Sequence, residues 1–344
     1  MKEVYLVTGA SGHLGNTIVH MLLEEKKKVR CLVLPNDPCV SLKDCDCEIF
    51  RGDVTSIETI EKAFDVPEDT FLYVIHSAGI VSIASKHDDL VYNVNVNGTK
   101  NVVSLVMKHK NSKLVHISSV HAIYEKENHE QMKEITDFDE NKVVGLYAKT
   151  KAIASKYVLE KTKEGLNACI VHPSGILGPN DYGKGHLTQL VIDYLNGGLT
   201  ACVNGGYDFV DVRDVARGTI NATKMGKSGE CYILSNKYYK VVDILGMVSK
   251  ITGKKKLKTV LPMWLAKLTA PLAELYYKIL KQPPLYTSYS LYTLTSNSNF
   301  SNQKAKDELK YTTRDMEDTL YDMILFLMKT NRLKDKYDIK KANN

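Results

Sequence analysis

The amino-terminal segment constrains the fold of this chain more than any other part. A short apolar run at 4–7 is followed by Gly9, Gly12 and Gly15, and an amphipathic stretch covers 16–25. This order of strand, glycine-rich turn and helix is typical of a dinucleotide site, where the free N–H groups of the helix N-terminus meet phosphates. Gly9 would allow the tight turn, Gly12 the approach of a pyrophosphate, and Gly15 the close packing of helix on strand. A glycine-rich turn that binds nothing is the alternative interpretation.

Strand and helix patterns alternate along the first half of the chain. Short runs rich in Val, Ile and Leu predict further strands at 29–34, 47–51, 71–76, 113–117 and 168–172. The stretches between them predict helices at 56–64, 88–109 and 147–162. This alternation predicts an α/β fold, a doubly wound parallel sheet with helices on both faces. Ligands of such sheets bind at the carboxyl ends of the strands. Candidate residues follow five strands directly: Gly9, Asp53, Ala78 with Gly79, Ser118 with Ser119, and Pro173.

Tyr147 and Lys151 are the strongest candidates for chemistry. They stand four residues apart in a predicted helix and therefore project from one face. A free tyrosine has a pKa of about 10. A cation beside the phenol favours the phenolate and lowers that pKa. Such a pair can exchange a proton with an alcohol or a carbonyl. The spacing alone is also common on solvated helix faces, so the surrounding residues have to support the assignment.

Composition and charge exclude several classes of function. A net charge of +6, with 44% hydrophobic and 25% charged residues, is ordinary for a globular protein. No basic stripe interleaved with aromatic residues points to nucleic acid, and no long apolar run predicts a membrane span. A strand that begins at residue 4 leaves no room for a signal peptide. Seven cysteines without paired spacing favour reduced thiols in a cytoplasm, with no metal site.

A series of motifs within residues 4–216 resembles the extended short-chain dehydrogenases/reductases, the superfamily of NAD-dependent epimerases and dehydratases. The motifs occur in the family's order and begin at Thr8 (TGxxGxxG), Gly52 (GDVT), His76 (HSAG), Asn95 (NVNGT), Ser118 (SS), Tyr147 (YxxxK), His172 (HPSGILGP) and Phe209 (FVDVRDVA). The segment 300–311 is similar to the branch that holds dihydroflavonol reductases and 3β-hydroxysteroid dehydrogenases. The resemblance implies a Rossmann fold with a smaller C-terminal substrate lobe. It also implies an NAD(P)-dependent oxidoreductase for a secondary alcohol/ketone or an aldehyde, including apolar substrates of steroid or polyketide type.

The resemblance implies catalytic roles for Ser119, Tyr147 and Lys151. Tyr147 would exchange a proton with the substrate oxygen, and Lys151 would lower the tyrosine pKa and hold the nicotinamide ribose. Ser119 would hold the substrate oxygen in place. Ser118 is the alternative to Ser119, and strand-end capping is the alternative for both. The cofactor would be held by Gly9, Ser11, Gly12, His13, Leu14, Gly15, Arg30, Asp53, Val54, Ser77, Ala78, Gly79, Lys151, Pro173 and Ile176. Asp53 would accept a hydrogen bond from the adenine, although a helix N-cap explains it equally well.

The choice between NAD and NADP depends on the end of the second strand. Similar NADP-dependent reductases have an arginine where this chain has Leu34, and NAD-specific relatives have an acidic residue near Val33. Arg30 could reach a phosphate and Asp37 a ribose hydroxyl. A leucine cannot pair with a phosphate, so the sequence favours NAD.

The resemblance also implies a domain division and a set of partners. Residues 1–180 would mainly form the dinucleotide-binding domain, to which 205–235 would return. Residues 181–204 and 236–330 would mainly form the substrate lobe, and 331–344 a frayed polar tail. The helices at 88–109 and 147–162 would pair two copies in a homodimer. A nucleotide-sugar epimerase/dehydratase is the alternative function, and a non-catalytic cofactor-sensing protein is the third. The second half has only four arginines with which to grip a diphosphate, which counts against the epimerase.

The segment 259–281 predicts an amphipathic helix. Its apolar residues recur at spacings of four and three: Leu261, Leu265, Leu268, Leu272, Leu275 and Ile279. Pro271 should kink or split this helix. Such a stripe most often faces a core, which predicts a helix that covers the substrate lobe. A lid for an apolar substrate, with peripheral membrane contact over 259–283, is the alternative.

Overall fold

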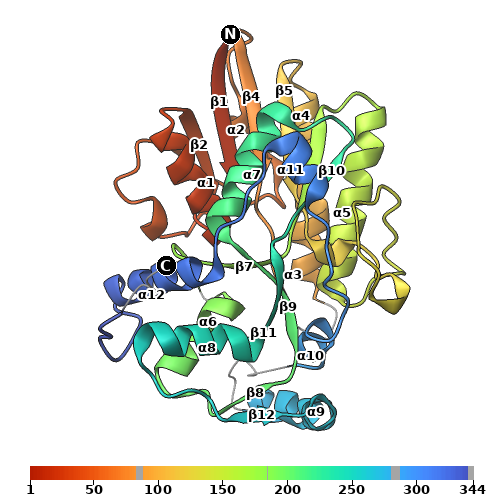
Figure 1. The fold of residues 1–344 in the computed structure, drawn as a ribbon. Coiled ribbons are helices and arrows are strands. Elements are labelled where there is room, and N and C mark those ends of the chain that lie inside the picture. Colours follow the sequence, from red (N-terminus) through yellow and green to blue (C-terminus); the bar gives the residue numbers. More distant parts are fainter. Residues whose placement is uncertain (83–87, 184, 280–286, 340–344) are drawn as a thin grey trace.

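The computed structural model describes residues 1–82, 88–183, 185–279 and 287–339, and its centre is a seven-stranded parallel sheet (Figure 1). Every neighbouring pair of strands in this sheet is parallel. The spatial order is β10 (Cys231–Leu234), β6 (Ala168–Pro173), β5 (Ser112–Ile117), β4 (Thr70–His76), β1 (Lys2–Thr8), β2 (Lys28–Val33) and β3 (Glu48–Arg51). The predicted fold class is confirmed, and the strand β10 completes the sheet beside β6.

The sheet is buried on both faces because its side chains alternate between two apolar clusters. In β1, Leu6 joins a cluster with Phe64, whereas Val7 joins a second cluster with Leu22. The first cluster lies under α2 (Ile57–Phe64), α4 (Thr99–Met107) and α5 (Leu146–Lys163), and the second under α1 (His13–Glu24), α7 (Val212–Met225) and α11 (Gln303–Leu309). Parallel strands that are covered on both faces have continuously apolar sequences, which is why the sequence pattern identified these strands.

The predicted helix at 88–109 begins as α3 (Asp89–Tyr92), passes through a π-helical stretch at Asn93–Gly98, and continues as α4. The Asn95 side chain lies in the π-helical stretch. It accepts from the Ile80 N–H at 2.8 Å and donates to the Ile80 carbonyl and to the Thr150 hydroxyl. A local change of helix type is a common way to direct one side chain toward a functional site. Asn95 thereby ties the loop after β4 to α5.

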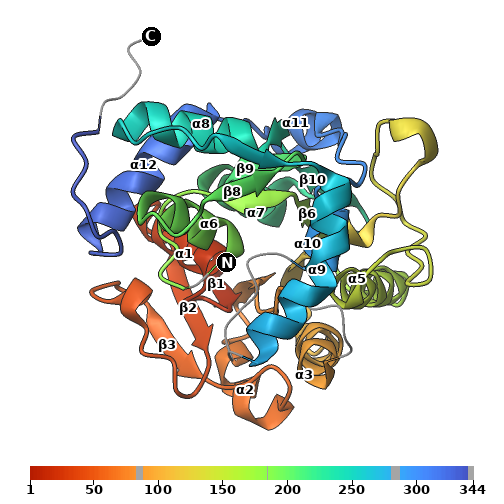
Figure 2. The same ribbon diagram turned by 90° about the horizontal axis from the view of Figure 1, so that it is seen from below.

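A smaller lobe lies beyond the carboxyl edge of the sheet (Figures 1 and 2). Its strands form a three-stranded sheet of β11 (Lys237–Lys240), β9 (Gly206–Asp211) and β7 (Gly175–Leu177), and a pair of β12 (Thr259–Leu261) and β8 (Ala201–Val203). Its helices are α6 (His186–Leu195), α8 (Val241–Thr252), α9 (Met263–Ile279), α10 (Ser288–Thr293) and α12 (Met316–Lys329). Short 3-10 turns occupy Val40–Leu42, Val120–Ala122 and Glu127–His129. Within the described ranges, no helix has both the length and the apolar character needed to cross a membrane.

Two segments of the C-terminal third have contacts that the sequence did not indicate. Within 236–330, which was assigned mainly to the smaller lobe, the helix α11 packs against α7 and β10 on the large sheet. Residues 331–339 do not fray, because the Tyr337 hydroxyl donates to the Leu195 carbonyl at 2.6 Å and Arg332 donates to the Asp181 and Gly183 carbonyls. Residues 340–344 of the expected tail lie outside the described residues.

Two leucines of the predicted apolar stripe of α9 do not face a core, since Leu268 and Leu272 are each 68% exposed. The helix runs unbroken past Pro271. Among its described side chains, Ala266 and Ala270 are buried against Leu291 of α10, with Met263 packed beside them. The side chains of Leu275 and Ile279, and residues 280–283, lie outside the described part.

Candidate active site

The glycine turn between β1 and α1 has the shape expected for a phosphate cradle. Gly9 has a φ of +64°, and a Cβ there would lie 2.8 Å from the Cα of Ala78. A Cβ on Gly15 would overlap the Gly9 carbonyl oxygen, at well under 3.0 Å. Gly12 differs, since its φ of −68° suits any residue and a Cβ would meet only the Gly9 oxygen at 3.3 Å. Gly9 and Gly15 are required by the fold, whereas a Cβ on Gly12 would have only this one close contact at the N-terminus of α1. A dinucleotide fits this turn, because phosphates bind at free N–H groups of a helix N-terminus.

Lys151 lies where the carboxyl ends of β4 and β5 meet. Its ammonium donates to the Ile117 carbonyl at 2.8 Å, and a Cβ added to Gly79 would lie 3.3 Å from its Nζ and 3.2 Å from the Asn95 Oδ1. The side chain is only 6% exposed. Burial disfavours the charged form and lowers the pKa of Lys151 to about 8. The predicted catalytic lysine is thus adjacent to the predicted cofactor loop after β4.

Tyr147 and Ser119 come together, and Ser118 points elsewhere. Burial raises the pKa of Tyr147 to about 12, and a hydrogen bond with the Ser119 side chain opposes that shift. The Ser118 hydroxyl instead bonds the Ser155 hydroxyl at 2.7 Å. Alternate residues of an extended chain face opposite sides, so only one serine of the pair can reach the site. The structure does not show the expected lowering of the Tyr147 pKa by Lys151, because burial is the largest influence on the phenol.

The start of α5 is held by a tyrosine from far along the chain. Gly145, just before α5, has a φ of +93°, and a Cβ there would overlap the ring of Tyr289 on α10. Tyr289 is 7% exposed, and no polar atom of the described residues pairs with its hydroxyl. Burial, and after it the neighbouring Tyr147 phenol, raise the pKa of Tyr289. The helix α10 therefore closes over the segment that carries Tyr147.

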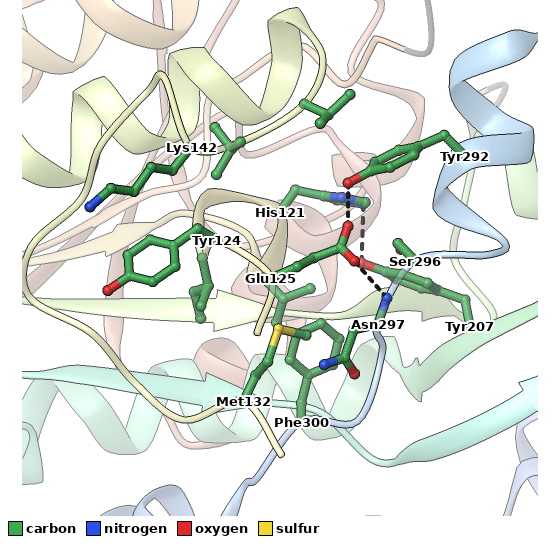
Figure 3. Close-up of a pocket in the computed structure, with 14 residues that line it drawn as sticks. His121, Tyr124, Glu125, Met132, Lys142, Tyr207, Tyr292, Ser296, Asn297 and Phe300 are labelled. Carbon is green, nitrogen blue, oxygen red and sulfur yellow. Dashed lines mark hydrogen bonds between the residues drawn. The ribbon is translucent and has the colours of Figure 1, made fainter. Parts of the chain in front are cut away.

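A cavity of about 90 Å³ lies beside this group (Figure 3). His121 stacks on Tyr207 with ring centroids 5.4 Å apart. The same imidazole lies edge-to-face with the Tyr147 ring, with centroids 6.0 Å apart. Burial lowers the pKa of His121 to about 4, so the imidazole is neutral at physiological pH. Glu125 accepts from the Tyr292 hydroxyl and from the Asn297 N–H.

The walls of this cavity offer no free cation. Lys142 lines one side but its ammonium points away from Glu125 in Figure 3, lies over the Tyr124 ring and is paired with Asp139 at 3.8 Å. The remaining lining is apolar or neutral: Val120, Ile123, Met132, Val143, Val144, Ser296 and Phe300. The arrangement can surround an uncharged ring system but has no group prepared for a phosphate.

Several predicted cofactor residues surround the glycine turn. The Ser11 hydroxyl donates to the Asp37 carboxylate at 2.6 Å, His13 bonds the Pro179 carbonyl through its Nε2 at 2.8 Å, and Leu14 is buried. The Ala78 N–H donates to the Thr8 hydroxyl, which brings the loop Ser77–Gly79 against the end of β1.

The other predicted cofactor residues lie farther along the same edge. Asp53 follows β3, and its carboxylate accepts from the Thr55 N–H at 2.9 Å in a local turn. The N-cap of α2 is Ser56, so the interpretation of Asp53 as that N-cap is wrong. Val54 is buried, Pro173 ends β6, and Ile176 lies in β7.

Arg30 does not belong to the site, and its assignment as a cofactor ligand is wrong. It lies in the middle of β2, paired with Leu6 of β1, and not at the carboxyl end of the strand. Its guanidinium donates to Glu48 and to the Ala63 and Asp65 carbonyls at the end of α2. Cations at a helix C-terminus satisfy carbonyls that have no partner within the helix. The role of Arg30 is therefore to fix α2 on the sheet.

The resemblance placed the substrate between the smaller lobe and the loop from His121 to Val144, and this loop supplies much of the cavity lining. Phe300 opens the segment 300–311 that carried part of the resemblance. Tyr207 and Tyr292 were not singled out, since no motif contains them. Tyr207 stands two positions before Phe209, so it shares one face of β9 with that motif residue, and strand alternation was the one available signal.

Comparison with known proteins agrees with this geometry. Residues 6–245 match the 3-beta hydroxysteroid dehydrogenase/isomerase family. The chain is 30% identical to a putative dihydroflavonol 4-reductase of Synechocystis sp. over 269 residues, which cover 77% of each chain. It is 27% identical to the sterol demethylase protein B of Methylococcus capsulatus, over 88% of this chain and 92% of the relative.

Solved structures extend the same comparison. The crystal structure of gox2253 superposes with a TM-score of 0.83 at 29% identity, over 96% of this chain and 99% of that one. A UDP-glucose 4-epimerase of Thermotoga maritima shares the fold with a TM-score of 0.72 at 19% identity, over 95% of this chain and 99% of that one. The chain therefore belongs to the 3-beta hydroxysteroid dehydrogenase/isomerase family and is an NAD(P)-dependent oxidoreductase of the extended short-chain dehydrogenase/reductase type.

Proposed function

We propose that this enzyme interconverts an uncharged, ring-containing ketone and its secondary alcohol, with Ser119, Tyr147 and Lys151 as the residues at the reacting oxygen. One observation supports this most strongly: Ser119 bonds Tyr147, while Lys151 lies beside Gly79 and donates to the Ile117 carbonyl, at the edge of the sheet that also carries the glycine turn. A bound nicotinamide dinucleotide supplies or accepts the hydride. Tyr147 stays protonated at neutral pH, which suits it to donate a proton to the substrate oxygen during reduction. Ser119 holds that oxygen, and Lys151 holds the ribose.

The proposal of an uncharged substrate rests on the contacts of the four arginines in the second half of the chain. Arg213 is bonded to Asp211 and Asp322, and Arg314 is bonded to Asp214. Arg217 pairs with Glu25, and Arg332 donates to backbone carbonyls. All four arginines of the second half are thus engaged, and none lines the cavity beside Tyr147. Bidentate arginines are the usual grip on a diphosphate, so these contacts favour a reductase over a nucleotide-sugar epimerase.

We propose NAD as the preferred cofactor. The Leu34 side chain is 57% exposed at the end of β2, where it offers nothing to a phosphate. Asp37 reaches the glycine turn through Ser11, so a carboxylate stands where a ribose hydroxyl is expected. A carboxylate accepts hydrogen bonds from a 2′-hydroxyl and repels a 2′-phosphate. Arg51 is used to hold this loop, since its guanidinium donates to the Pro35 and Asp37 carbonyls.

The remaining expectations are proposals of the same kind. Residues 1–180 with 205–235 hold the cofactor, and the smaller lobe holds the substrate. Two copies pair through the helices at 88–109 and 147–162, a proposal supported by the exposed apolar side chains of Leu90 and Met107. The protein works in the cytoplasm, which is consistent with seven cysteines that form no disulfide. Light scattering of the purified chain tests the dimer.

A cofactor-oxidation screen tests the function. Cyclic ketones, aldehydes and UDP-glucose are offered with NADH and NADPH in parallel, and absorbance at the nicotinamide band is followed. We expect net oxidation of NADH with cyclic ketones, and its loss in Tyr147→Phe with cofactor binding retained. Conversion of UDP-glucose without net absorbance change would assign the chain to the epimerases instead. Full activity of Tyr147→Phe would contradict the proposed role of the phenol.

A further inference from the structure

Tyr289 is a buried tyrosine whose hydroxyl has no hydrogen-bond partner among the described residues. Buried polar groups in proteins are nearly always paired, so an unpaired hydroxyl calls for an explanation. Thr219 and Tyr311 also carry buried hydroxyls without a partner in this part of the chain, but they lie at α7 on the large sheet. Tyr289 differs because the Tyr147 phenol raises its pKa, which indicates that the two phenols lie close together.

The ring of Tyr289 is fixed in its orientation. It stands in the first turn of α10, where a capping box fixes the helix N-terminus. A Cβ on Gly145 would lie 2.8 Å from Cζ, the ring carbon that carries the hydroxyl. His121 and Tyr292 lie beside the ring, each with its centroid 6.3 Å from that of Tyr289. The hydroxyl is therefore held at the start of α5, two residues before Tyr147, and this packing keeps it from turning toward another partner.

The neighbouring tyrosine hydroxyls are already engaged. Tyr292 donates to Glu125, and the Tyr207 hydroxyl bonds the His121 Nε2 at 3.3 Å (Figure 3). Tyr289 has no such contact within the described chain, and burial raises its pKa, so the phenol stays protonated at neutral pH. A protonated phenol in this setting is a hydrogen-bond donor that still lacks an acceptor. An acceptor on a molecule bound in the site would satisfy it.

We propose that Tyr289 donates a hydrogen bond to a second oxygen of the substrate, a hydroxyl or a carbonyl near the ketone that Tyr147 protonates. This inference rests on the proposed function and narrows its substrate class to oxygenated cyclic ketones. The imidazole of His121 lies next to both tyrosines, with centroids 6.0 Å from Tyr147 and 6.3 Å from Tyr289, so one small substrate can contact both phenols. A site with a buried donor discriminates against an analogue that cannot accept, because the donor is then left unpaired.

Matched pairs of ketones test this contact. Cyclohexanones with a hydroxyl at the second, third or fourth ring carbon are compared with those that carry a methyl group at the same carbon, because a methyl group is similar in size and cannot accept a hydrogen bond. For at least one pair, the ratio of kcat/KM for the hydroxyketone to that for the methyl ketone should fall about tenfold in Tyr289→Phe, the effect of one neutral hydrogen bond. The fall should come from a higher KM for the hydroxyketone, with kcat for the methyl ketone unchanged.

Tyr311→Phe is the matched control. The Tyr311 side chain is 2% exposed, and its hydroxyl also has no partner among the residues that the structure describes. Its ring lies against Gly218 of α7 on the large sheet. Both variants remove a buried, unpaired hydroxyl, so an effect of that removal on the fold alone would occur in both. Tyr311→Phe should keep the wild-type ratio for every pair of ketones.

Two results would overturn the proposal. A ratio that Tyr289→Phe leaves unchanged for all three pairs would show that the hydroxyl does not contact the substrate. An equal loss of kcat/KM for both members of each pair would assign Tyr289 to the positioning of Tyr147 instead.

A binding measurement separates this inference from the proposed reaction. Saturation-transfer NMR of the same ketones with the enzyme and NAD⁺ measures the preference for the hydroxyketone without turnover. A preference that Tyr289→Phe removes would support the contact even in an enzyme that reduces none of these ketones, which would refute the reaction alone. Equal binding of each pair by the wild type and by Tyr289→Phe would overturn the contact, whatever the enzyme reduces.

Discussion

The glycine turn allows one prediction to be worked out in detail, because Gly12 and Gly15 have different reasons to be glycine. Gly15→Ala places a methyl group inside the Gly9 carbonyl, so the start of α1 has to move off the turn. Forced overlap of this kind costs about 2–3 kcal/mol or more. Gly12→Ala keeps an ordinary extended backbone and meets one atom at 3.3 Å. Reduced entropy of the unfolded chain offsets that contact, so its stability should change by no more than about 1 kcal/mol.

The two variants should rank in the opposite order for cofactor binding, with Gly12→Ala the more affected. A methyl group at Gly12 occupies the open space in front of the helix N-terminus, where the pyrophosphate is expected, and should weaken NADH binding at least tenfold, about 1.4 kcal/mol. Urea unfolding without cofactor measures stability, and calorimetric titration with NADH measures affinity. Gly12→Ala should unfold like the wild type and lose the rise in melting temperature that NADH gives the wild type. Wild-type affinity in Gly12→Ala would refute the assignment of the turn, and wild-type stability in Gly15→Ala would refute the packing argument.

Three other predictions concern the site itself. Ser119→Ala should lower kcat/KM for ketone reduction by about a hundredfold. Ser118→Ala loses a hydrogen bond to α5, so it should lower thermal stability by about 1 kcal/mol and leave kcat/KM nearly unchanged. Equal rate losses for the two variants in steady-state assays would show that the wrong serine was assigned. Lys151 has a pKa of about 8 when folded against 10.5 in a free side chain, so the folded state binds fewer protons between these values. Urea titrations give the free energy of unfolding of the wild type and of Lys151→Met. The difference between the two, wild type minus variant, should rise by about 2 kcal/mol from pH 8 to 10. A difference that does not change with pH would contradict the buried ammonium. Tyr289→Phe removes a buried hydroxyl that has no partner among the described residues. The melting temperature of the cofactor-free enzyme should therefore stay the same or rise by about 2 °C. A clear fall of the melting temperature in calorimetry would mean that the hydroxyl is bonded.

The sequence was sufficient for six of the seven strands of the large sheet and for the position of the candidate residues at its edge, because both follow from short-range patterns. Buried parallel strands are apolar runs, and the residues directly after them share one edge. Arg30 was misassigned because an apolar run does not say where a strand ends or where a long side chain points. The carbonyls at the end of α2, which are distant in sequence, decide its position.

The parts that could not be predicted depend on long-range packing. Among the described side chains of α9, Ala266 and Ala270 are buried against Leu291 of α10. A periodic pattern alone favoured the leucines, of which Leu268 and Leu272 lie on the outside. The pKa of Tyr147 was misjudged for a similar reason: the spacing to Lys151 is visible in the sequence, whereas the depth of burial, which sets the direction of the shift, is not.

The position of α11 has a consequence for how the chain is completed during synthesis. Ala305 and Leu309 of this helix fill the apolar surface over the large sheet, next to α7 and β10, and Phe300 bridges to Met132 near the cavity. The nucleotide half therefore lacks part of its covering until residue 309 has left the ribosome. A nascent chain that stops short of α11 would expose that surface to chaperones, and we expect a chain truncated after β10 to aggregate for the same reason.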